Sequence, residues 1–363
     1  MTVGAPRTVL RLGTRRSALA TAQAQLVADA LAPVAGIPVE LVPITTSGDR
    51  TQSDVQPLEA IGGTGVFVTE LRRALLASEV DLAVHSYKDL PTGAYDGLAI
   101  GAVPPRADPR DVLVARDGLT LGELPAGARV GTGSPRRAAQ LRALDLGLSV
   151  EPIRGNVDTR LRAVSEGRYD AVVLARAGLH RLGRTDEATE VLDPIQVLPA
   201  PGQGALAVEC RADDDELLTW LAALDDSDSN AAVRAERAVL AALEAGCSAP
   251  VGALAEVVDS GDGAELSLRA VVAAPDGSDT LRRSMSGPVE DPDGLGRRLA
   301  AVLLEDGAAE LAPELLPRQS GESGQNAQAV DQSSHASVAP RTPEHERGSV
   351  HTNPPSTTTE RVS

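Results

Sequence analysis

The chain has 363 residues and a formal charge of −17, and 42% of its residues are hydrophobic although only 1% are aromatic. That length predicts about two or three globular domains, and the acidic balance argues against nucleic-acid binding, which needs a cationic face. No run is long enough for a membrane span and Met1–Leu10 holds no apolar signal-peptide core, so we expect a cytoplasmic protein without membrane partners. The cysteines, Cys210 and Cys247, lack metal-ligand spacing, so no metal site is expected.

The first predicted elements form an α/β unit. A short apolar run at Thr8–Leu12 predicts a strand, "GTRRS" follows it, and an Ala/Leu-periodic helix is expected over about Ser17–Leu31. The stretch Thr45–Gly65 is long, polar and punctuated by glycine, which is typical of a lid or a disordered loop. The next predicted strand is Val80–Val84.

Two later strand-to-helix junctions repeat this theme. In "GTGSPRR", Ser134 can cap a helix and Pro135 suits its first position. In "VEPIRGNVDTRLRAV", Asn156 is a candidate cap and Arg160 lies one turn into the helix. Strands and helices that alternate at this spacing predict parallel α/β sheets, in which ligands bind at the carboxyl ends of strands beside helix N-termini.

After Val197 the pattern changes to that of a small α+β unit. An Ala-rich helix is expected over about Ser229–Ala245, then a strand and turn in "ELSLRAVVAAPDGSD" and a last helix at Leu295–Leu304. The polar stretch Pro317–Ser363 cannot bury enough apolar surface to offset the entropy of ordering, so it predicts a disordered tail. The tail's widely spaced histidines are interpreted as solvated rather than metal-binding: His335, His345 and His351.

Several arginines lie at or near predicted helix starts, where a positive charge opposes the helix dipole. They are Arg15, Arg136, Arg137, Arg154 and Arg160. A substrate with several carboxylates would explain this placement, because guanidinium groups pair bidentately with carboxylates. The alternative is that individual arginines bond neighbouring Asp or Glu side chains at the surface.

Other motifs carry narrower interpretations. "GTGSPRR" lacks the ending of a phosphate loop and the third glycine of a dinucleotide fingerprint, so nucleotide binding fits poorly. His85 and Ser86 are adjacent on a strand and point to opposite faces, which argues against a Ser/His hydrolase. Cys210 is predicted to be core. Cys247, in "LEAGCSAPVG", is either a buried inert thiol or, on an open loop, a covalent attachment point.

Eight motifs together resemble the porphobilinogen deaminase family, over about Val9–Leu315. In chain order they are "RLGTRRSALA", "VHSYKDLP", "DPRD", "GTGSPRR", "RGNVDTRL", "AGLHRLG", "PGQGALAVECR" and "EAGCSAPVG". The resemblance implies two periplasmic-binding-protein-like α/β domains that form a cleft, and a small C-terminal α+β domain. On this basis we expect domain 1 at 1–104 with 200–222, domain 2 at 105–199, domain 3 at 223–316, and the tail at 317–363.

The resemblance also implies the chemistry. In that family four porphobilinogens condense head to tail with loss of ammonia, and the linear tetrapyrrole is hydrolysed from a retained dipyrromethane cofactor. By its place in the motifs, Cys247 would hold the cofactor through a thioether, and Asp89 would be the catalytic carboxylate that stabilises cationic intermediates. The implied cofactor- and substrate-binding residues are Arg15, Ser17, Phe67, Ser86, Lys88, Thr132, Ser134, Arg136, Arg137, Arg154, Arg160, Arg181 and Gln203. A monomer is expected.

Lys88 is the only lysine in the chain. An ammonium is compact and donates in three directions, whereas a guanidinium is a wide planar fork. We therefore predict that Lys88 reaches a cofactor carboxylate where a fork would displace Asp89. The alternatives are a surface pair between Lys88 and Asp89, or an accident of composition.

Two questions stay open at this point: how the chain's departures from the family affect its lid, and whether it belongs to another functional class. The chain has Ala60 and Thr64 where family members often carry lysines in the lid, which leaves open how a lid engages the growing chain. A solute-binding module with the same two-lobed fold would need neither Asp89 nor Cys247, and its mass would lack the two pyrrole units of the cofactor. An enzyme of acyl or phosphoryl transfer is disfavoured because no motif matches one.

Overall fold

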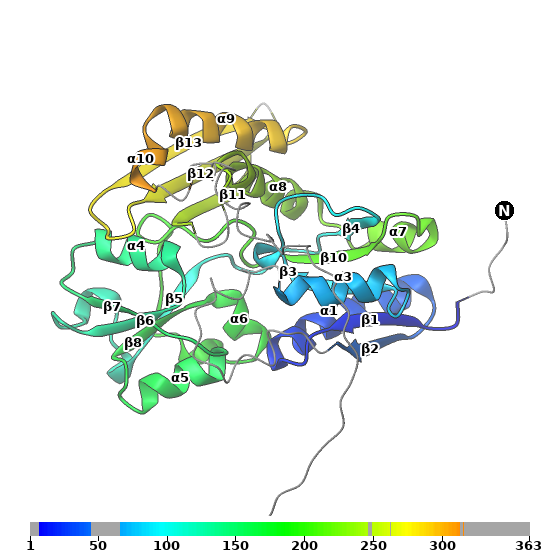
Figure 1. Cartoon of the computed structure of the whole chain (residues 1–363), viewed down its shortest axis with the longest axis horizontal. Helices are drawn as coiled ribbons and strands as arrows, with labels where there is room; N and C mark the ends of the chain where they lie inside the picture. Colours follow the sequence, from blue (N-terminus) through cyan, green and yellow to red (C-terminus); the bar gives the residue numbers. More distant parts are fainter. Residues whose placement is uncertain (1–6, 45–65, 246–248, 262, 313–314, 316–363) are drawn as a thin grey trace, which may run out of the picture. The chain divides into compact units, whose positions relative to one another are not determined.

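The structure is a computed structural model that describes residues 7–44, 66–245, 249–261, 263–312 and 315. By its internal contacts the chain divides into Met1–Pro317 and Arg318–Ser363, and the described residues all belong to the first unit. They build three sheets with helices packed on them (Figure 1). The predicted lid at Thr45–Gly65, the proposed attachment residue Cys247 and the tail at 317–363 lie outside the described residues.

The first sheet has the strand order β2-β1-β3-β10-β4. In that order its strands are Val39–Pro43, Leu10–Thr14, Leu82–Ser86, Leu206–Arg211 and Leu98–Ala102. Its helices are α1 (Ala18–Ala35), α3 (Val66–Leu76) and α7 (Asp215–Ala222). Because side chains alternate along a strand, Leu82 and Val84 pack with α1 and α7 on one face, while Ala83 packs with α3 on the other.

The second sheet has the order β7-β6-β8-β5-β9. In that order its strands are Ser149–Pro152, Arg129–Thr132, Ala171–Ala175, Asp111–Ala115 and Glu190–Val191. Its helices are α4 (Pro135–Ala143), α5 (Val157–Ser165) and α6 (Arg176–Arg181), with short 3-10 turns at Arg116–Gly118, Leu121–Glu123 and Thr185–Glu187. Leu113 of β5 packs with α4, and its neighbours Val112 and Val114 pack with α5 and α6 on the opposite face.

Both sheets are mixed, which corrects the expectation of parallel sheets. β1 runs parallel to β2 and β3, but β10 is antiparallel to both β3 and β4. Likewise β6 is parallel to β7 and β8, but β5 is antiparallel to β8 and β9. The exceptions are the strands at which the chain enters from the other sheet: β5 follows β4, and β10 follows β9. Such strands do not come from a βαβ crossover, which is the connection that keeps neighbouring strands parallel.

The third sheet is antiparallel and confirms the predicted small α+β domain. Its strands, in sheet order, are β11 (Val251–Asp259), β12 (Ala264–Ala273) and β13 (Thr280–Pro288). The helices that follow or precede it are α8 (Ser227–Ala242), α9 (Pro292–Glu305) and α10 (Ala308–Leu311). Val239 of α8, Leu268 of β12 and Leu299 of α9 share one core. Together with the two α/β sheets, this domain gives the predicted fold class.

Several local predictions are confirmed, and some element ends differ from the predicted ones by two to four residues. Cys210 is fully buried in the core beneath α1, as predicted. Helix α1 continues through Pro33 and ends at Gly36, whose left-handed φ of 68° closes the helix. Helix α9 begins at Pro292, three residues before the predicted start, because Asp291 accepts a hydrogen bond from Gly294 N at 3.0 Å and caps it.

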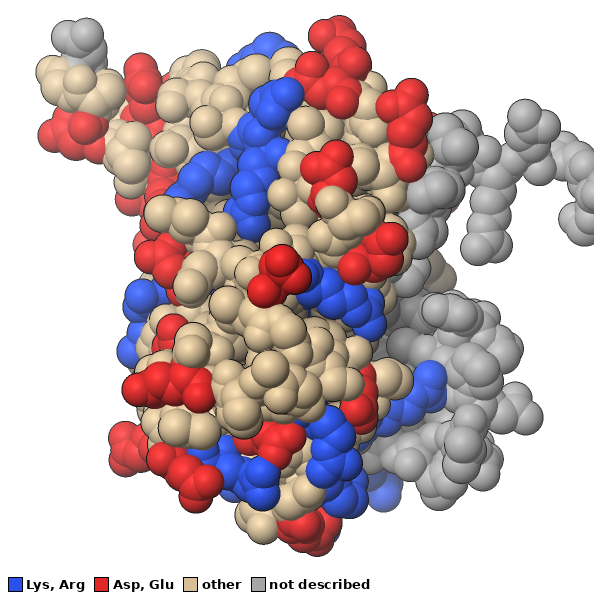
Figure 2. All heavy atoms as spheres, turned by 90° about the vertical axis from the view of Figure 1, so that its left-hand side faces the viewer, with Lys and Arg blue, Asp and Glu red and all other residues tan. Residues whose placement is uncertain are grey.

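Charge on the surface is mixed. On the face shown in Figure 2, acidic and basic side chains are interspersed in small groups. Exposed ion pairs of the chain, such as Arg283 with Asp306 at 2.6 Å, contribute little to stability because water screens them. Among the described helices, none is long and apolar enough to cross a membrane.

Candidate active site

Strand β3 ends at Ser86, two residues later than predicted, and a single 3-10 turn, η4 (Tyr87–Asp89), follows it. Ser86 Oγ accepts a hydrogen bond from Gln23 Nε2 of α1 at 2.9 Å. His85 Nε2 instead lies 3.1 Å from Glu209 Oε2 in the buried interior. The two neighbouring side chains therefore have separate surroundings, and the argument against a Ser/His hydrolase is confirmed.

Lys88 lies in η4 with a partly buried side chain. Its Nζ donates to Gln203 Oε1 at 3.2 Å. Burial disfavours the ammonium form, and the nearby guanidinium of Arg137 adds repulsion, so that the pKa of Lys88 falls to about 8 while the charge of Asp89 partly opposes the shift. The alternative interpretation, a solvated surface pair between Lys88 and Asp89, does not fit a partly buried ammonium that donates to Gln203.

Gln203 stands on the segment by which the chain returns to the first sheet. Its neighbours Gly202 and Gly204 have φ of 75° and 88°, and a Cβ on Gly204 would lie 2.3 Å from the carbonyl oxygen of Ala107. Glycine is required here because two backbone segments approach so closely. The Gln203 side chain is thereby buried, and its Nε2 donates at 2.7 Å to both Pro109 O and Asp111 Oδ1.

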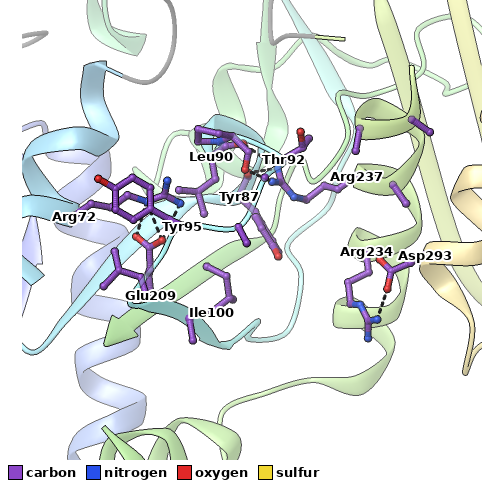
Figure 3. A pocket seen from close by; sticks show the side chains of 18 of the residues that line it. Arg72, Tyr87, Leu90, Thr92, Tyr95, Ile100, Glu209, Arg234, Arg237 and Asp293 are labelled. Carbon is purple, nitrogen blue, oxygen red and sulfur yellow. Dashed lines mark hydrogen bonds and ion pairs between the residues drawn. The ribbon is translucent and has the colours of Figure 1, made fainter. Parts of the chain in front are cut away.

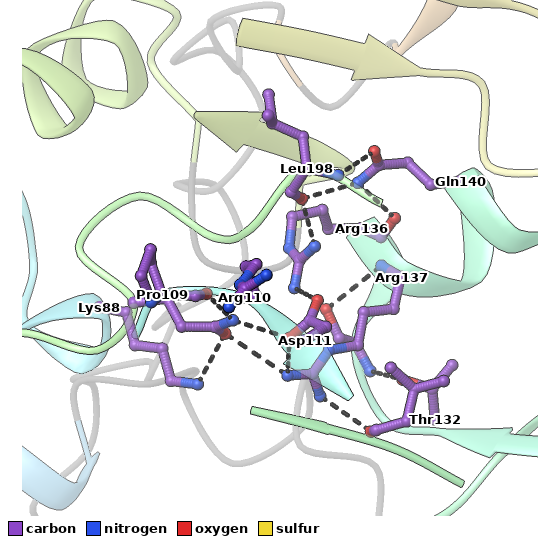
Figure 4. Close-up of polar contacts among 12 residues, drawn as sticks. Lys88, Pro109, Arg110, Asp111, Thr132, Arg136, Arg137, Gln140 and Leu198 are labelled. Atoms are coloured by element: carbon purple, nitrogen blue, oxygen red, sulfur yellow. Dashed lines mark hydrogen bonds and ion pairs between the residues drawn. The ribbon is translucent and has the colours of Figure 1, made fainter. Parts of the chain in front are cut away.

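Asp111, which the sequence interpretation did not select, is the centre of the site (Figure 4). It is the first residue of β5 and is fully buried. Its Oδ1 accepts from Arg137 Nη2 at 2.7 Å, and its Oδ2 accepts from Arg136 Nη2 at 2.8 Å. Burial alone would raise the pKa of Asp111, but the two guanidinium groups outweigh burial and hold that pKa well below its usual range.

The start of α4 positions both arginines. Ser134 Oγ accepts from Arg137 N at 3.5 Å as the helix cap, Pro135 occupies the first helical position, and Ser134 N donates to Thr132 Oγ1 at 3.2 Å. The predicted cap is confirmed. Burial also lowers the pKa of Arg136. Arg136 and Arg137 thus pair with a carboxylate in the interior rather than at the surface.

Arg136 is further held by the segment before β10. Its Nη1 donates to the carbonyl oxygen of Leu198, which also accepts from Gln140 Nε2 at 3.0 Å. Leu198 N in turn donates to Gln140 Oε1 at 2.8 Å. These contacts fix the guanidinium of Arg136 in one orientation.

Arg160 lies one turn into α5, behind the cap Asn156, which accepts from Thr159 N at 2.9 Å as predicted. Its Nε donates to Gly155 O at 2.9 Å. Its guanidinium reaches the "GTGSPRR" loop, because a Cβ built on Gly133 would lie 3.5 Å from its Nη2. Burial, and then repulsion from Arg137, lower the pKa of Arg160 to about 10.

Arg181 ends α6 and donates to Gly204 O at 2.6 Å, next to Gln203. Burial lowers its pKa to about 10. Among the described residues, neither Arg160 nor Arg181 pairs with a carboxylate, although both cations are partly buried. Such cations favour an anionic ligand.

Four further residues that the sequence predicted as binding residues are not among those described around Asp111. Ser17 caps α1 by accepting from Ala20 N at 3.3 Å, and Arg15 precedes it by two residues at the end of β1. Arg154 is exposed. The side chain of Phe67 is outside the described part of the structure.

The charges of this site do not balance. Arg136 and Arg137 share the carboxylate of Asp111, and Lys88 lies near both Asp111 and Asp89. Arg160 lies close enough to Arg137 to repel it, and neither Arg160 nor Arg181 has a carboxylate partner among the described residues. We call these cations, together with Gln203, the cation cluster. An excess of buried positive charge in a chain of −17 is a local feature suited to carboxylates, for which arginine supplies two parallel donors.

Comparison with known proteins gives one family. Residues 10–219 match the family described as "Porphobilinogen deaminase, dipyromethane cofactor binding domain", and residues 230–305 match "Porphobilinogen deaminase, C-terminal domain". The porphobilinogen deaminase of Mycobacterium tuberculosis is 60% identical over 308 residues, which cover 84% of this chain and 98% of the relative. That of Nocardia farcinica is 58% identical over 326 residues, covering 88% of this chain and 93% of the relative.

Solved structures give a more distant likeness. A periplasmic substrate-binding protein of an ABC transporter from Coxiella burnetii matches with a TM-score of 0.38 and 15% identity, over 59% of this chain and 91% of that one. A putative methionine-binding lipoprotein from Bacillus subtilis matches with a TM-score of 0.36 and 12% identity, over 59% and 90%. The fold described above rests on the sheets themselves.

Proposed function

The chain belongs to the porphobilinogen deaminase family, and we propose that its cation cluster binds the carboxylates of substrate and cofactor. Members of this family are hydroxymethylbilane synthases, and this chain has their function in tetrapyrrole biosynthesis: four porphobilinogens condense head to tail and release ammonia. Each porphobilinogen carries an acetate and a propionate arm. The observation that supports the binding role is that the partly buried guanidinium groups of Arg160 and Arg181 donate only to carbonyl oxygens among the described residues.

The donor set fits the family's dipyrromethane cofactor. Its rings carry carboxylate arms, and the partly buried Arg160 and Arg181 have only carbonyl partners among the described residues. Lys88, held by Gln203, supplies a compact donor beside them. When bound, the cofactor supplies the pyrrole to which the first substrate is joined. Arg160, Arg181 and Lys88 hold and orient its arms.

Asp89 is the proposed catalytic carboxylate. It follows Lys88 in η4 at the end of β3, and its side chain is partly buried. Loss of ammonia from the aminomethyl carbon of a substrate leaves a cation, which a carboxylate at this position stabilises while it accepts hydrogen bonds from pyrrole N–H groups. Lys88 donates to Gln203, and we assign the two side chains to different parts of the ligand.

Cys247 is the proposed attachment atom for the cofactor. Of the two cysteines in the chain, Cys210 of β10 is fully buried in the core shared with α1, and burial raises its pKa to about 11, which makes it a poor nucleophile. Cys247 lies in the motif "EAGCSAPVG" that carries the family resemblance.

Intact mass tests this assignment. The purified protein is expected to exceed its sequence mass by two pyrrole units, Cys247→Ser to match the sequence mass and make no bilane, and Cys210→Ala to keep both cofactor and activity. A mass increase that survives Cys247→Ser would remove Cys247 from the assignment, and loss of the cofactor in Cys210→Ala would do the same.

We propose a monomeric state, which the family resemblance implies, and the cytoplasmic location that is expected from the sequence. Light scattering coupled to size-exclusion chromatography tests the first, with a mass near 37.4 kDa expected for the full chain. Cell fractionation tests the second. A dimer mass, or recovery outside the cytoplasm, would contradict the respective assignment.

A further inference from the structure

A cavity lies beside the segment that carries Lys88 and Asp89. Its volume is about 610 Å³, and it is lined by Tyr87–Ile100 in part, by α8 and by α9 (Figure 3). Tyr87 and Leu90 line it, whereas Lys88 and Asp89 between them do not. This cavity, which we call the α8–α9 pocket, is of a size typical for small-molecule sites and is separate from the cation cluster.

The lining of the α8–α9 pocket is rich in arginine. Four arginines line it, Arg72, Arg234, Arg237 and Arg297, against two carboxylates, Glu209 and Asp293. Glu209 is paired with Arg72 at 2.8 Å, and Asp293 is paired with Arg234. Arg297 of α9 is exposed and forms no ion pair among the described residues, although its charge acts on Asp291. Among the described lining residues, positive charge is therefore in excess.

The rest of the lining is apolar and flat. The guanidinium of Arg237 lies over the ring of Tyr87 at 4.5 Å, and that of Arg72 lies over the ring of Tyr95 at 4.6 Å. Three small side chains of α8 also line the pocket: Ala238, Ala241 and Ala242. Small side chains and stacked rings leave room for a planar aromatic body, and the arginines favour acidic groups on its edge.

We propose that the α8–α9 pocket is an effector site for a small planar aromatic dicarboxylate, and that its occupation lowers the rate of the reaction at Asp89. The coupling runs through Arg237, which is buried and donates to the carbonyl oxygens of Tyr87 and Leu90 at 3.1 Å and of Pro91 at 2.6 Å. A carboxylate accepts more strongly than a carbonyl. A ligand that draws Arg237 toward its own carboxylate withdraws these hydrogen bonds from the turn that carries Lys88 and Asp89.

The probe for this site is naphthalene-2,6-dicarboxylate, with the neutral naphthalene-2,6-dicarboxamide as its control. Binding to the holoenzyme is measured by calorimetry, and kcat and KM for porphobilinogen are measured at several probe concentrations. The dicarboxylate is expected to bind and to lower kcat without changing KM. The diamide is expected to bind at least tenfold more weakly, since it lacks the charge.

Variants separate this pocket from the cation cluster, which also accepts carboxylates. Ala241→Trp fills the pocket from an exposed position of α8, and Arg297→Glu reverses the charge of one lining residue. Each variant is expected to weaken binding of the dicarboxylate about tenfold or more. Each is also expected to keep its activity in the absence of the probe. Arg298→Glu, one residue on and outside the lining, is the matched control and should leave binding within about twofold. Competition of the probe with porphobilinogen, or equal binding by Ala241→Trp and the unaltered enzyme, would overturn the proposal. It is independent of the assignment of Cys247.

Discussion

At the scale of single residues, Asp111 decides how the cations of the site are arranged. One buried carboxylate accepts from Arg136, Arg137 and Gln203, and Gln203 in turn accepts from Lys88. The positions of three cations therefore depend on one anion. That anion stabilises the fold and orients the site at once.

Asp111→Asn is expected to lower the free energy of unfolding by about 3 kcal/mol or more, because it leaves Arg136 and Arg137 buried beside each other without their anion. Urea unfolding measures this. The control Glu256→Gln removes the exposed partner of Arg269 and should change that free energy by less than about 1 kcal/mol. Equal losses in the two variants would show that Asp111 is no more than a surface partner.

The pKa of Lys88 predicts a pH dependence of substrate capture. Its ammonium is present below about pH 8 and is lost above it, so kcat/KM should fall about fivefold between pH 8 and pH 9. Lys88→Arg stays charged throughout this range, so its profile should lack this fall even if its activity is lower. If the unaltered enzyme and Lys88→Arg lose kcat/KM at the same pH, the titrating group is the substrate or a residue other than Lys88.

The same shift has a consequence for stability. Because burial lowers the folded-state pKa of Lys88 from 10.5 to about 8, the charged form costs stability, and the full cost is present below pH 8. Stability gained from its deprotonation accrues between about pH 8 and 10.5, where the unfolded chain still holds the proton. Lys88→Met, compared with the unaltered chain by urea unfolding, should be more stable at pH 7 by about 2 kcal/mol and by less at pH 10.

Asp89→Asn tests the proposed catalytic carboxylate. The variant keeps the shape and removes the charge, so kcat should fall by more than about 100-fold, which corresponds to about 3 kcal/mol of transition-state stabilisation. Asp96→Asn, an exposed carboxylate in the following loop, should leave kcat within about twofold. A raised KM with an unchanged kcat would make Asp89 a binding residue instead.

At the scale of elements, two chain segments that connect the first and second sheets form the base of the site. One runs between β4 and β5 and carries Ala107 and Asp108, and the other runs before β10 and carries Gln203 and Gly204. They meet where Ala107 N donates to Gly204 O at 3.3 Å. The site depends on this contact because Gln203 and Asp111 flank it.

Gly204→Ala should disturb this contact specifically. Its φ of 88° disfavours any side chain, and the added Cβ would lie 2.3 Å from Ala107 O, so a loss of more than about 2 kcal/mol in the free energy of unfolding is expected, with lower kcat/KM. Gly183→Ala has a φ of 68° but no atom within 4 Å of the added Cβ, and it should cost about 1 kcal/mol with activity kept. Urea unfolding and kinetics of both variants give the comparison, and equal effects would mean that only φ matters.

At the scale of the whole molecule, Glu236 of α8 joins the third sheet to both connecting segments. It is fully buried, and its Oε1 accepts from Arg106 Nη1 at 2.6 Å and from Ala255 N at 2.8 Å. Its Oε2 accepts from Arg106 Nη2 at 2.9 Å and from Gly202 N at 2.6 Å. Arg106, Gly202 and Ala255 belong to three different parts of the chain, so one carboxylate couples their folding.

Glu236→Gln should weaken that coupling. The amide replaces one acceptor with a donor that faces other donors, so the free energy of unfolding should fall by about 3 kcal/mol. The single tryptophan, Trp220, packs in the first domain, and its fluorescence transition should separate from that of circular dichroism in this variant but coincide with it in the unaltered protein. Glu290→Gln, on the surface of the third domain, is the control. Coincident transitions with an unchanged midpoint in Glu236→Gln would contradict this role.

Local chemistry made part of this structure predictable. The caps Ser17, Ser134 and Asn156 each accept from a backbone N–H three residues later, so their partners lie within the same motif. The starts of α1, α4 and α5 follow from such signals. The roles of Asp89 and Cys247 come from the family resemblance and stay predictions, as do the domain boundaries.

Local signals did not predict the role of Asp111 or the antiparallel strands, because the partners of these residues are distant in the sequence. The carboxylate of Asp111 binds residues 25, 26 and 92 positions away. One signal was present: a carboxylate opens the otherwise apolar strand "DVLVA", and a charged residue at the start of a fully buried strand needs a buried counter-ion. The direction of β10 depends on a connection through another sheet, which local periodicity does not record.

The buried thiol of Cys210 has a practical consequence. Since burial raises its pKa to about 11, a thiol-directed reagent at pH 7 reacts with it very slowly in the folded protein. The chain has one other cysteine, Cys247, the proposed attachment point, and a thioether there would remove its reactivity. On that proposal, counting reactive thiols with a chromogenic disulfide measures cofactor loading: one equivalent per chain is expected before assembly, and none afterwards.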